Sequence, residues 1–126
     1  MSLSCLVVDN APVNRDFVVR SLLGAKLSSC DEATNLPEAL ARLRVAKNKK
    51  NPYKVLIVSA ALDTLTIADI LKAIKDMGGY DSLLVLTPDQ DKALAQEAIR
   101  LGAHSYFAMP LNEARFISKI KPLLGA

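Results

Sequence analysis

Long hydrophobic runs are absent from this sequence of 126 residues. No apolar stretch approaches the roughly 18 residues that a membrane-spanning helix needs. The N-terminus also lacks the basic segment followed by an apolar core that is typical of a signal peptide. We therefore expect a soluble, cytoplasmic protein that does not bind membranes.

Cysteine is scarce, and the two that are present, Cys5 and Cys30, lack the C-x-x-C spacing of metal or redox sites. We expect both to be reduced residues in strands or at strand ends. The chain also lacks the G-x-G-x-x-G and Walker patterns, and residues 9–14 are rich neither in glycine nor in Ser/Thr. A phosphate cradle is therefore missing, and we predict neither a cofactor nor an enzyme activity.

A large charge imbalance is missing as well, because 16 basic and 13 acidic residues leave a net charge of +3. The densest basic stretch, Lys47 to Lys50, stands beside Asn51 and Pro52. This pattern predicts a solvated loop, and we expect no binding of nucleic acid.

Half of the residues are hydrophobic and about a quarter are charged, which is ordinary globular usage. The length suits one domain of about 100 to 200 residues. We predict a single domain over residues 1–126.

Five short apolar runs alternate with five segments of helical periodicity. The predicted strands span residues 3–8, about 26–30, 55–58, 83–86 and 105–108. The first helix runs from Pro12 to Gly24 and carries an apolar stripe of Val13, Phe17, Val18 and Leu22. Asn35 and Glu38 resemble a capping box at the start of the second helix. The remaining helices cover about 67–77, 94–101 and 116–124.

This alternation predicts an α/β fold with helices on both faces of a parallel sheet. Right-handed crossovers favour the flavodoxin-like, doubly wound (βα)₅ arrangement with strand order 2-1-3-4-5. Ligands of such sheets bind at the carboxyl ends of the strands. The candidate site residues are therefore Asp9, Asn10, Ser59, Thr87 and Met109.

Two segments resemble response-regulator receiver domains, particularly those attached to hybrid sensor kinases. Residues 6–15 read Leu-Val-Val-Asp-Asn-Ala-Pro-Val-Asn-Arg, where the family has an apolar strand, two acids and Asn-Pro-Val-Asn-Arg. Residues 102–111 read Gly-Ala-His-Ser-Tyr-Phe-Ala-Met-Pro-Leu, which is similar to the family's Gly-Ala-acid-acid-Tyr-apolar-x-Lys-Pro-apolar pattern. With residues 53–59 matching the third strand and Thr87 ending the fourth, the resemblance covers nearly the whole chain.

The departures from the family carry the functional argument. The resemblance implies that two acids and a strand-ending aspartate hold Mg²⁺, that this aspartate accepts a phosphoryl group, and that a lysine pairs with the phosphoryl oxygens. Here the acid pair is Asp9 and Asn10, the acceptor position is Ser59, and the lysine position is Met109. We expect weak or absent Mg²⁺ binding and no phosphotransfer to Ser59, a weak nucleophile unless a base is in reach. Met109 is expected to fill the lysine's space with an apolar side chain.

Each of these residues also has a structural interpretation. Ser59 could turn the chain after its strand, and Asp9 could cap the first helix or keep a residual role with a cation. Asp63 could supply a substitute carboxylate or cap the following helix. His104 occupies an acidic position that the family normally exposes, and we interpret it as a surface histidine.

The resemblance also implies a switch and a partner surface. In active receivers a threonine hydroxyl moves toward the phosphoryl group and an aromatic ring turns inward behind it. The corresponding residues here are Thr87 and Tyr106. The partner face would come from residues 91–100, 104–107 and 112–121, and it includes Arg100, Tyr106, Arg115 and Lys119. A homodimer through the fourth helix, fifth strand and fifth helix is a further expectation.

We therefore predict an atypical receiver domain of phosphorelay signalling that binds a protein partner without phosphorylation. The partner would be a histidine kinase, an output domain or another signalling protein. The second hypothesis is a receiver phosphorylated at an unusual acceptor, Asp63 or Ser59. The third is a flavodoxin-like cofactor-binding enzyme, which the missing phosphate cradle disfavours.

Overall fold

Strands and helices alternate throughout the computed structural model, which describes residues 4–25, 29–62, 64–88 and 91–124. The strands are β1 (Ser4–Val8), β2 (Ser29–Ala33), β3 (Tyr53–Ser59), β4 (Tyr80–Thr87) and β5 (Ser105–Ala108). The helices are α1 (Pro12–Gly24), α2 (Leu36–Asn48), α3 (Ile67–Met77), α4 (Lys92–Arg100) and α5 (Glu113–Leu123). No helix in these residues is long and apolar enough to cross a membrane.

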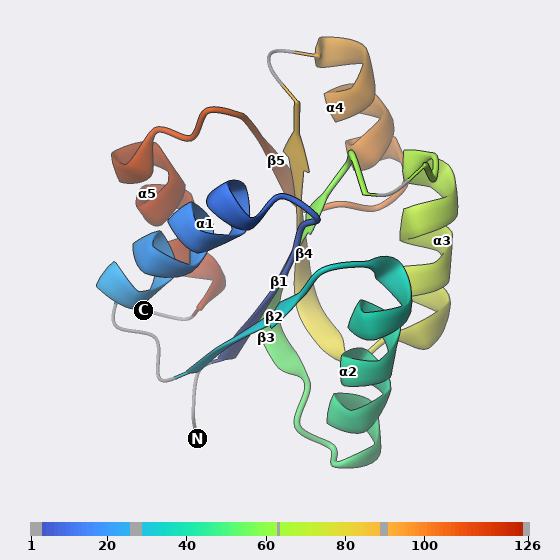
Figure 1. Ribbon diagram of the computed structural model, residues 1–126. Coiled ribbons are helices and arrows are strands. Elements are labelled where there is room, and N and C mark those ends of the chain that lie inside the picture. Colours follow the sequence, from blue (N-terminus) through green and yellow to red (C-terminus); the bar gives the residue numbers. More distant parts are fainter. Residues whose placement is uncertain (1–3, 26–28, 63, 89–90, 125–126) are drawn as a thin grey trace.

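The strands form one parallel sheet in the order β2-β1-β3-β4-β5, which confirms the predicted fold. Helices α1 and α5 cover one face, while α2, α3 and α4 cover the other (Figure 1). Coverage on both faces explains why β1, β3 and the second half of β4 are nearly continuous apolar runs.

Each face has its own hydrophobic core. On the α1 and α5 side, Phe116 and Ile120 pack with Cys5 and Val7, and the Phe116 ring meets Phe107 edge-on at 5.1 Å. On the other side, a cluster of aliphatic residues surrounds Leu6 and Val8 of β1; it includes Leu43, Ile70, Leu71 and Ile74. Each fully buried side chain of this size stabilises the fold by about 1.5–3 kcal/mol.

The second strand differs from its prediction. The predicted strand covers residues 26–30, of which 26–28 lie outside the described residues, whereas β2 continues to Ala33. Its centre is polar, with Asp31 and Glu32, and Ala33 is its one fully buried residue. An edge strand of this kind has no apolar run by which its end could be predicted. Leu3, the first residue of the first predicted strand, also lies outside the described residues.

The apolar stripe of α1 begins later than predicted. Val13 is 80% exposed, while Val18 and Leu22 are fully buried. The reason is angular: at 100° per residue, Val13 lies about 140° around the helix from Val18. The prediction that Val13 belongs to the buried stripe was therefore wrong.

The start of α2 is as predicted, but its end is not. Asn35 Oδ1 accepts a hydrogen bond from Glu38 N at 2.9 Å, which caps the helix. The helix continues through Asn48, so Lys47 lies in its last turn and not in a loop. A lysine there interacts favourably with the carbonyl end of the helix.

Candidate functional site

Three buried polar side chains lie at the carboxyl ends of the central strands: Asp9, Ser59 and Thr87, with 4%, 7% and 1% of their surface exposed. Asp9 directly follows β1, while Ser59 and Thr87 end β3 and β4, and these three strands are adjacent in the sheet. Buried polar groups need hydrogen-bond partners. Their partners therefore show how this pocket is arranged.

Asp9 is held against the loop that leads into α1. Its Oδ1 accepts a hydrogen bond from Ala11 N at 2.9 Å. Ala11 is itself the N-cap residue of α1, so Asp9 does not cap the amide groups of the first helical turn as its structural interpretation suggested. Burial raises the pKa of the Asp9 carboxyl, although the Ala11 amide and the Arg15 guanidinium both act to lower it.

Asn10 turns toward the neighbouring loop. Its Nδ2 donates to the Thr34 carbonyl at 2.5 Å. This hydrogen bond joins the loop after β1 to the loop after β2, which is a structural task that needs no negative charge. Asn10 thus lies beside Asp9 without adding a second carboxylate.

Arg15 is a site residue that could not be predicted from the sequence, beyond its place in the family motif. Its Nη1 donates to the Asp9 carbonyl at 2.8 Å, and its Nε pairs with Glu32 Oε1 at 3.0 Å. Its side chain is 16% exposed. A largely buried guanidinium thus ties the end of β1 to β2 and places positive charge near the Asp9 carboxylate.

Ser59 is engaged in a local turn. Its Oγ accepts a hydrogen bond from Ala61 N at 3.1 Å, the geometry expected of a serine that turns the chain. Asp63, the proposed substitute carboxylate, lies outside the described residues.

His104 has a partner at the other end of the sheet edge. The Nδ1 atom of the ring accepts a hydrogen bond from Leu83 N at 3.0 Å, and the backbone N–H of His104 donates to the Leu83 carbonyl at 2.8 Å. The residue is exposed, as expected, but its ring also satisfies a backbone amide near the start of β5. This position is separated from Ser59 along the strands.

The side chains at the two switch positions, Thr87 and Tyr106, are not directed at Asp9 and Ser59. The Thr87 hydroxyl donates to the Phe107 carbonyl at 3.4 Å, so it is directed at β5. Tyr106 is 43% exposed, so its ring is not turned into the core. Met109 N donates to the Thr87 carbonyl at 2.9 Å, and the Met109–Pro110 peptide bond is cis.

The residues that meet here do not fit a magnesium site. Mg²⁺ prefers octahedral oxygen ligation with one or two carboxylates and several waters. Among the described residues there is no group of three or more His, Cys, Asp or Glu side chains that could hold a metal ion. Asp9 is the one carboxylate among the five predicted crevice positions, and a backbone amide already binds it.

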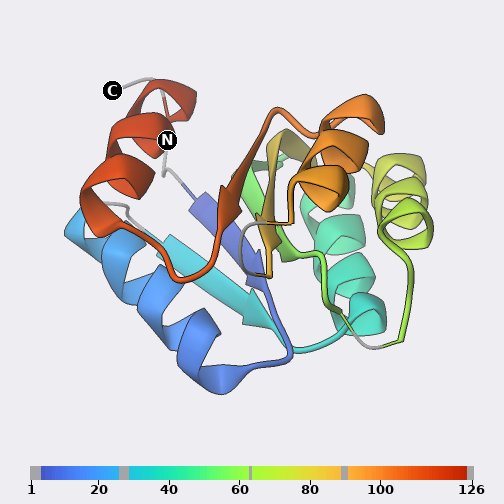
Figure 2. The same ribbon diagram turned by 90° about the horizontal axis from the view of Figure 1, so that it is seen from above.

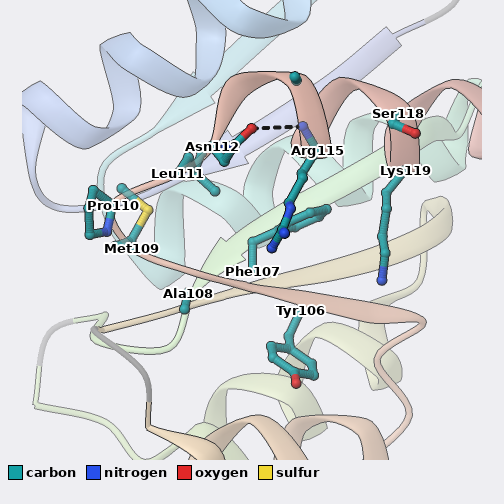
Figure 3. A pocket seen from close by; sticks show the side chains of 11 residues that line it. Tyr106, Phe107, Ala108, Met109, Pro110, Leu111, Asn112, Arg115, Ser118 and Lys119 are labelled. Carbon is teal, nitrogen blue, oxygen red and sulfur yellow. Dashed lines mark hydrogen bonds between the residues drawn. The ribbon is translucent and has the colours of Figure 1, made fainter.

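A hollow of about 900 Å³ lies between β5 and α5 (Figure 3). It brings together Tyr106, Arg115 and Lys119 of the predicted partner face, and Met109 contributes to its lining. Arg100 lies elsewhere, on α4, where it pairs with Glu97 at 3.0 Å.

The two cysteines are direct neighbours in the sheet, since Cys5 of β1 is the register partner of Cys30 in β2. Both are free thiols. Burial is the main cause that raises the pKa of each thiol to about 12. Neither is therefore a reactive thiolate at neutral pH.

Comparison with known proteins agrees with the observed fold. The sequence model of the response regulator receiver domain matches residues 5–121, and the chain belongs to that family. No curated protein matches the sequence. Receiver domains are modules of two-component signalling, so this is the class in which the chain functions.

Solved structures share the fold at low sequence identity. The receiver domain of AraT from Geobacillus stearothermophilus has a TM-score of 0.79 at 20% identity, covering 99% of this chain and 95% of that one. The chemotaxis response regulator CheY4 of Vibrio cholerae has a TM-score of 0.77 at 22% identity, covering 98% and 99%. The receiver domain of the sensor histidine kinase PA1611 from Pseudomonas aeruginosa PAO1, with a magnesium ion coordinated in its active site cleft, has a TM-score of 0.79 at 15% identity and full coverage of both chains.

Proposed function

We propose that this chain is an atypical receiver domain that acts as a phosphorylation-independent protein-interaction module. The observation that carries the proposal is that the polar side chains at the carboxyl ends of the strands already have hydrogen-bond partners within the fold. Asp9 and Ser59 each accept a nearby backbone amide, and the Thr87 hydroxyl is directed at β5. The polar groups at the strand ends are thus engaged in holding the fold, and a phosphoryl group would meet one carboxylate and no lysine.

Electrostatics supports this proposal. Phosphoryl transfer depends on fixed positive charge around the transferred group. In this chain Ser59 occupies the position of the acceptor aspartate, and Met109 occupies the position of the lysine. Arg15 is the cation near Asp9, but its guanidinium is held by the Asp9 carbonyl and Glu32.

The module would work in the cytoplasm, where its partner would be a histidine kinase, an output domain or another signalling protein. The N-terminal motif supports a place beside a hybrid sensor kinase. The partner face would include Arg100, Tyr106, Arg115 and Lys119, and a homodimer through α4, β5 and α5 is the alternative use of this face. Neither use requires an enzyme activity.

The pocket proposal is tested with beryllium fluoride, which mimics the phosphoryl group on active receivers. We expect that millimolar Mg²⁺ and beryllium fluoride leave the amide NMR signals around Thr87 and Tyr106 unchanged, because the acceptor carboxylate and the cation set are missing. Saturable shifts at these residues would contradict the proposal.

An unusual acceptor is the second candidate. Incubation with acetyl phosphate followed by mass spectrometry separates the two functions, because labelling at Asp63 or Ser59 would make the chain a working receiver. We expect no phosphorylated species. The hydrogen bond of Ser59 supports this expectation, since its hydroxyl oxygen accepts from the Ala61 amide, which is not a general base.

A further inference from the structure

Strand β5 lies at an open edge of the sheet, between α5 and α4 (Figure 2). Within the described part of the chain, β4 is its single neighbour in the sheet. An edge strand presents a row of N–H and C=O groups that another extended chain can pair with.

Two contacts establish which peptide groups face outward. Met109 N donates to the Thr87 carbonyl at 2.9 Å, and the Phe107 carbonyl accepts from the Thr87 hydroxyl at 3.4 Å. Residues 107 and 109 therefore direct their peptide groups toward β4. Because these directions alternate along a strand, the N–H and C=O groups of Tyr106 and Ala108 face the open edge. In the described residues, no loop or helix forms a backbone hydrogen bond with them.

The hollow beside this edge has a definite chemistry. Its lining combines an apolar floor, which includes Phe107, Met109 and Leu111, with two cations of α5. Arg115 and Lys119 are four residues apart, and both extend from α5 toward β5 (Figure 3). Neither forms an ion pair with a described residue, and the lining contains no acidic residue.

We propose that this groove binds an extended, acidic segment of a partner protein, which adds to β5 as a sixth strand of the sheet. The proposal rests on the proposed function, and it names the chemistry of the partner. Successive side chains of an added strand point to opposite faces. Acidic side chains on the α5 face would meet Arg115 and Lys119, and apolar ones on the other face would lie near Tyr106.

The peptide groups favour a strand over a helix as the occupant. A docked helix satisfies its own backbone groups and would leave those of Tyr106 and Ala108 without partners. Charge favours a different protein over a second copy of this chain, since two copies joined at this groove would bring the same pair of α5 cations together.

The probe is a capped hexapeptide of alternating glutamate and valine, titrated into the ¹⁵N-labelled chain. We expect saturable shifts along β5 and at Arg115 and Lys119. The amide protons of Tyr106 and Ala108 should exchange more slowly when the peptide is bound. The same peptide with N-methylated valines cannot donate its ladder hydrogen bonds and should not bind, and a lysine-valine peptide should fail because its charge is wrong.

Two double variants test the contribution of charge. Arg115→Glu with Lys119→Glu should raise the Kd of the acidic peptide about tenfold or more, because attraction at both positions becomes repulsion. The matched control, Arg44→Glu with Lys47→Glu, makes the same change in net charge on exposed residues of α2, across the sheet. It should change the Kd by less than about twofold, since distant exposed charges are screened.

Several outcomes would overturn the strand-addition proposal. They are absence of binding, binding that survives N-methylation, or peptide-induced shifts without protection of Tyr106 and Ala108. Sedimentation equilibrium of the chain alone decides on a second copy: a dimer abolished by the α5 double variant would overturn it in favour of self-pairing. The beryllium fluoride titration is carried out without peptide, and the peptide titration without beryllium fluoride. Failure of the pocket proposal and failure of the strand-addition proposal are therefore recognised in separate measurements.

Discussion

At the residue scale, Asp9 is a buried carboxyl whose ionisation opposes folding. Burial raises its pKa above the ordinary value of 3.8, so the folded state holds the proton more tightly than the unfolded chain. The stability that this group contributes is fully present below pH 3.8. It is lost as the pH rises through the folded-state pKa.

Asp9→Asn should therefore stabilise the protein at neutral pH. The amide keeps an oxygen for the Ala11 N–H bond but carries no charge to desolvate. We expect the gain in unfolding free energy to be larger at pH 8 than at pH 4, measured by urea unfolding across this range. An equal effect at both values, or a loss at pH 8, would show that attraction between Asp9 and Arg15 outweighs burial.

Asp16→Asn is the matched control, and it lies on α1, the helix that follows Asp9. Asp16 forms an exposed pair with Arg20 at 3.0 Å, and its side chain is 64% exposed. Removing one exposed carboxylate of this kind should change stability by less than about 0.5 kcal/mol at any pH, because such pairs contribute little.

At the scale of elements, the turn between α3 and β4 approaches α2 so closely that it requires a glycine. Gly79 has a φ of +89°, and a Cβ built there would lie 2.3 Å from the Leu43 carbonyl oxygen. Its own carbonyl accepts a hydrogen bond from Tyr53 N at 2.9 Å, which aligns the start of β3. The turn therefore fixes α2, β3 and β4 relative to one another.

Gly79→Ala should destabilise the fold by at least about 2 kcal/mol, since backbone strain and a steric clash act together. Gly24→Ala is the control: outside its chain neighbours and its own helical backbone, no atom of the described residues lies within 4 Å of a Cβ at this position, and Ala should be neutral or stabilise by up to about 1 kcal/mol. Chemical unfolding of both variants measures the difference. Similar midpoints for the two would mean that the turn shifts at little cost.

Apolar elements could be predicted from the sequence, whereas polar ones could not be delimited. The apolar runs in the sequence predict the buried strands β1 and β3, and Asn35 and Glu38 indicate where α2 begins. β2 carries Asp31 and Glu32 at the sheet edge, so its end depends on pairing with β1, which no local pattern encodes. Basic residues at the end of α2 resemble a loop in composition although they are helical.

At the scale of the whole molecule, the order of strands and helices was sufficient to predict the fold. The contacts within the site could not be predicted without the three-dimensional structure. Topology predicts that Asp9, Ser59 and Thr87 share one end of the sheet, as they do. The side-chain directions could not be predicted, because they depend on backbone partners such as Ala11, Ala61 and the Phe107 carbonyl. The role of Arg15 depends likewise on β2 lying beside β1.

Rebuilding the pocket tests whether the whole domain still supports phosphotransfer. Ser59→Asp alone places a second carboxylate near Asp9 without a lysine or a complete acid pair, and like charges disfavour each other. We expect it to remain near background with acetyl phosphate. Adding Asn10→Asp supplies a third carboxylate for Mg²⁺, and adding Met109→Lys supplies the charge that steadies the transferred group.

The triple variant should label about a hundredfold faster than Ser59→Asp, the magnitude typical of fixed charges that stabilise a transferred group. Intact-mass spectrometry over time gives both rates, and wild type with its Ser59 hydroxyl bound to Ala61 is the baseline. If Ser59→Asp labels as fast as the triple variant, the surrounding pocket is competent and the loss is confined to the acceptor. If the triple variant stays unlabelled while it remains folded, the contacts of Asn10 with Thr34 and of Arg15 with Asp9 hold the loops away from an active geometry.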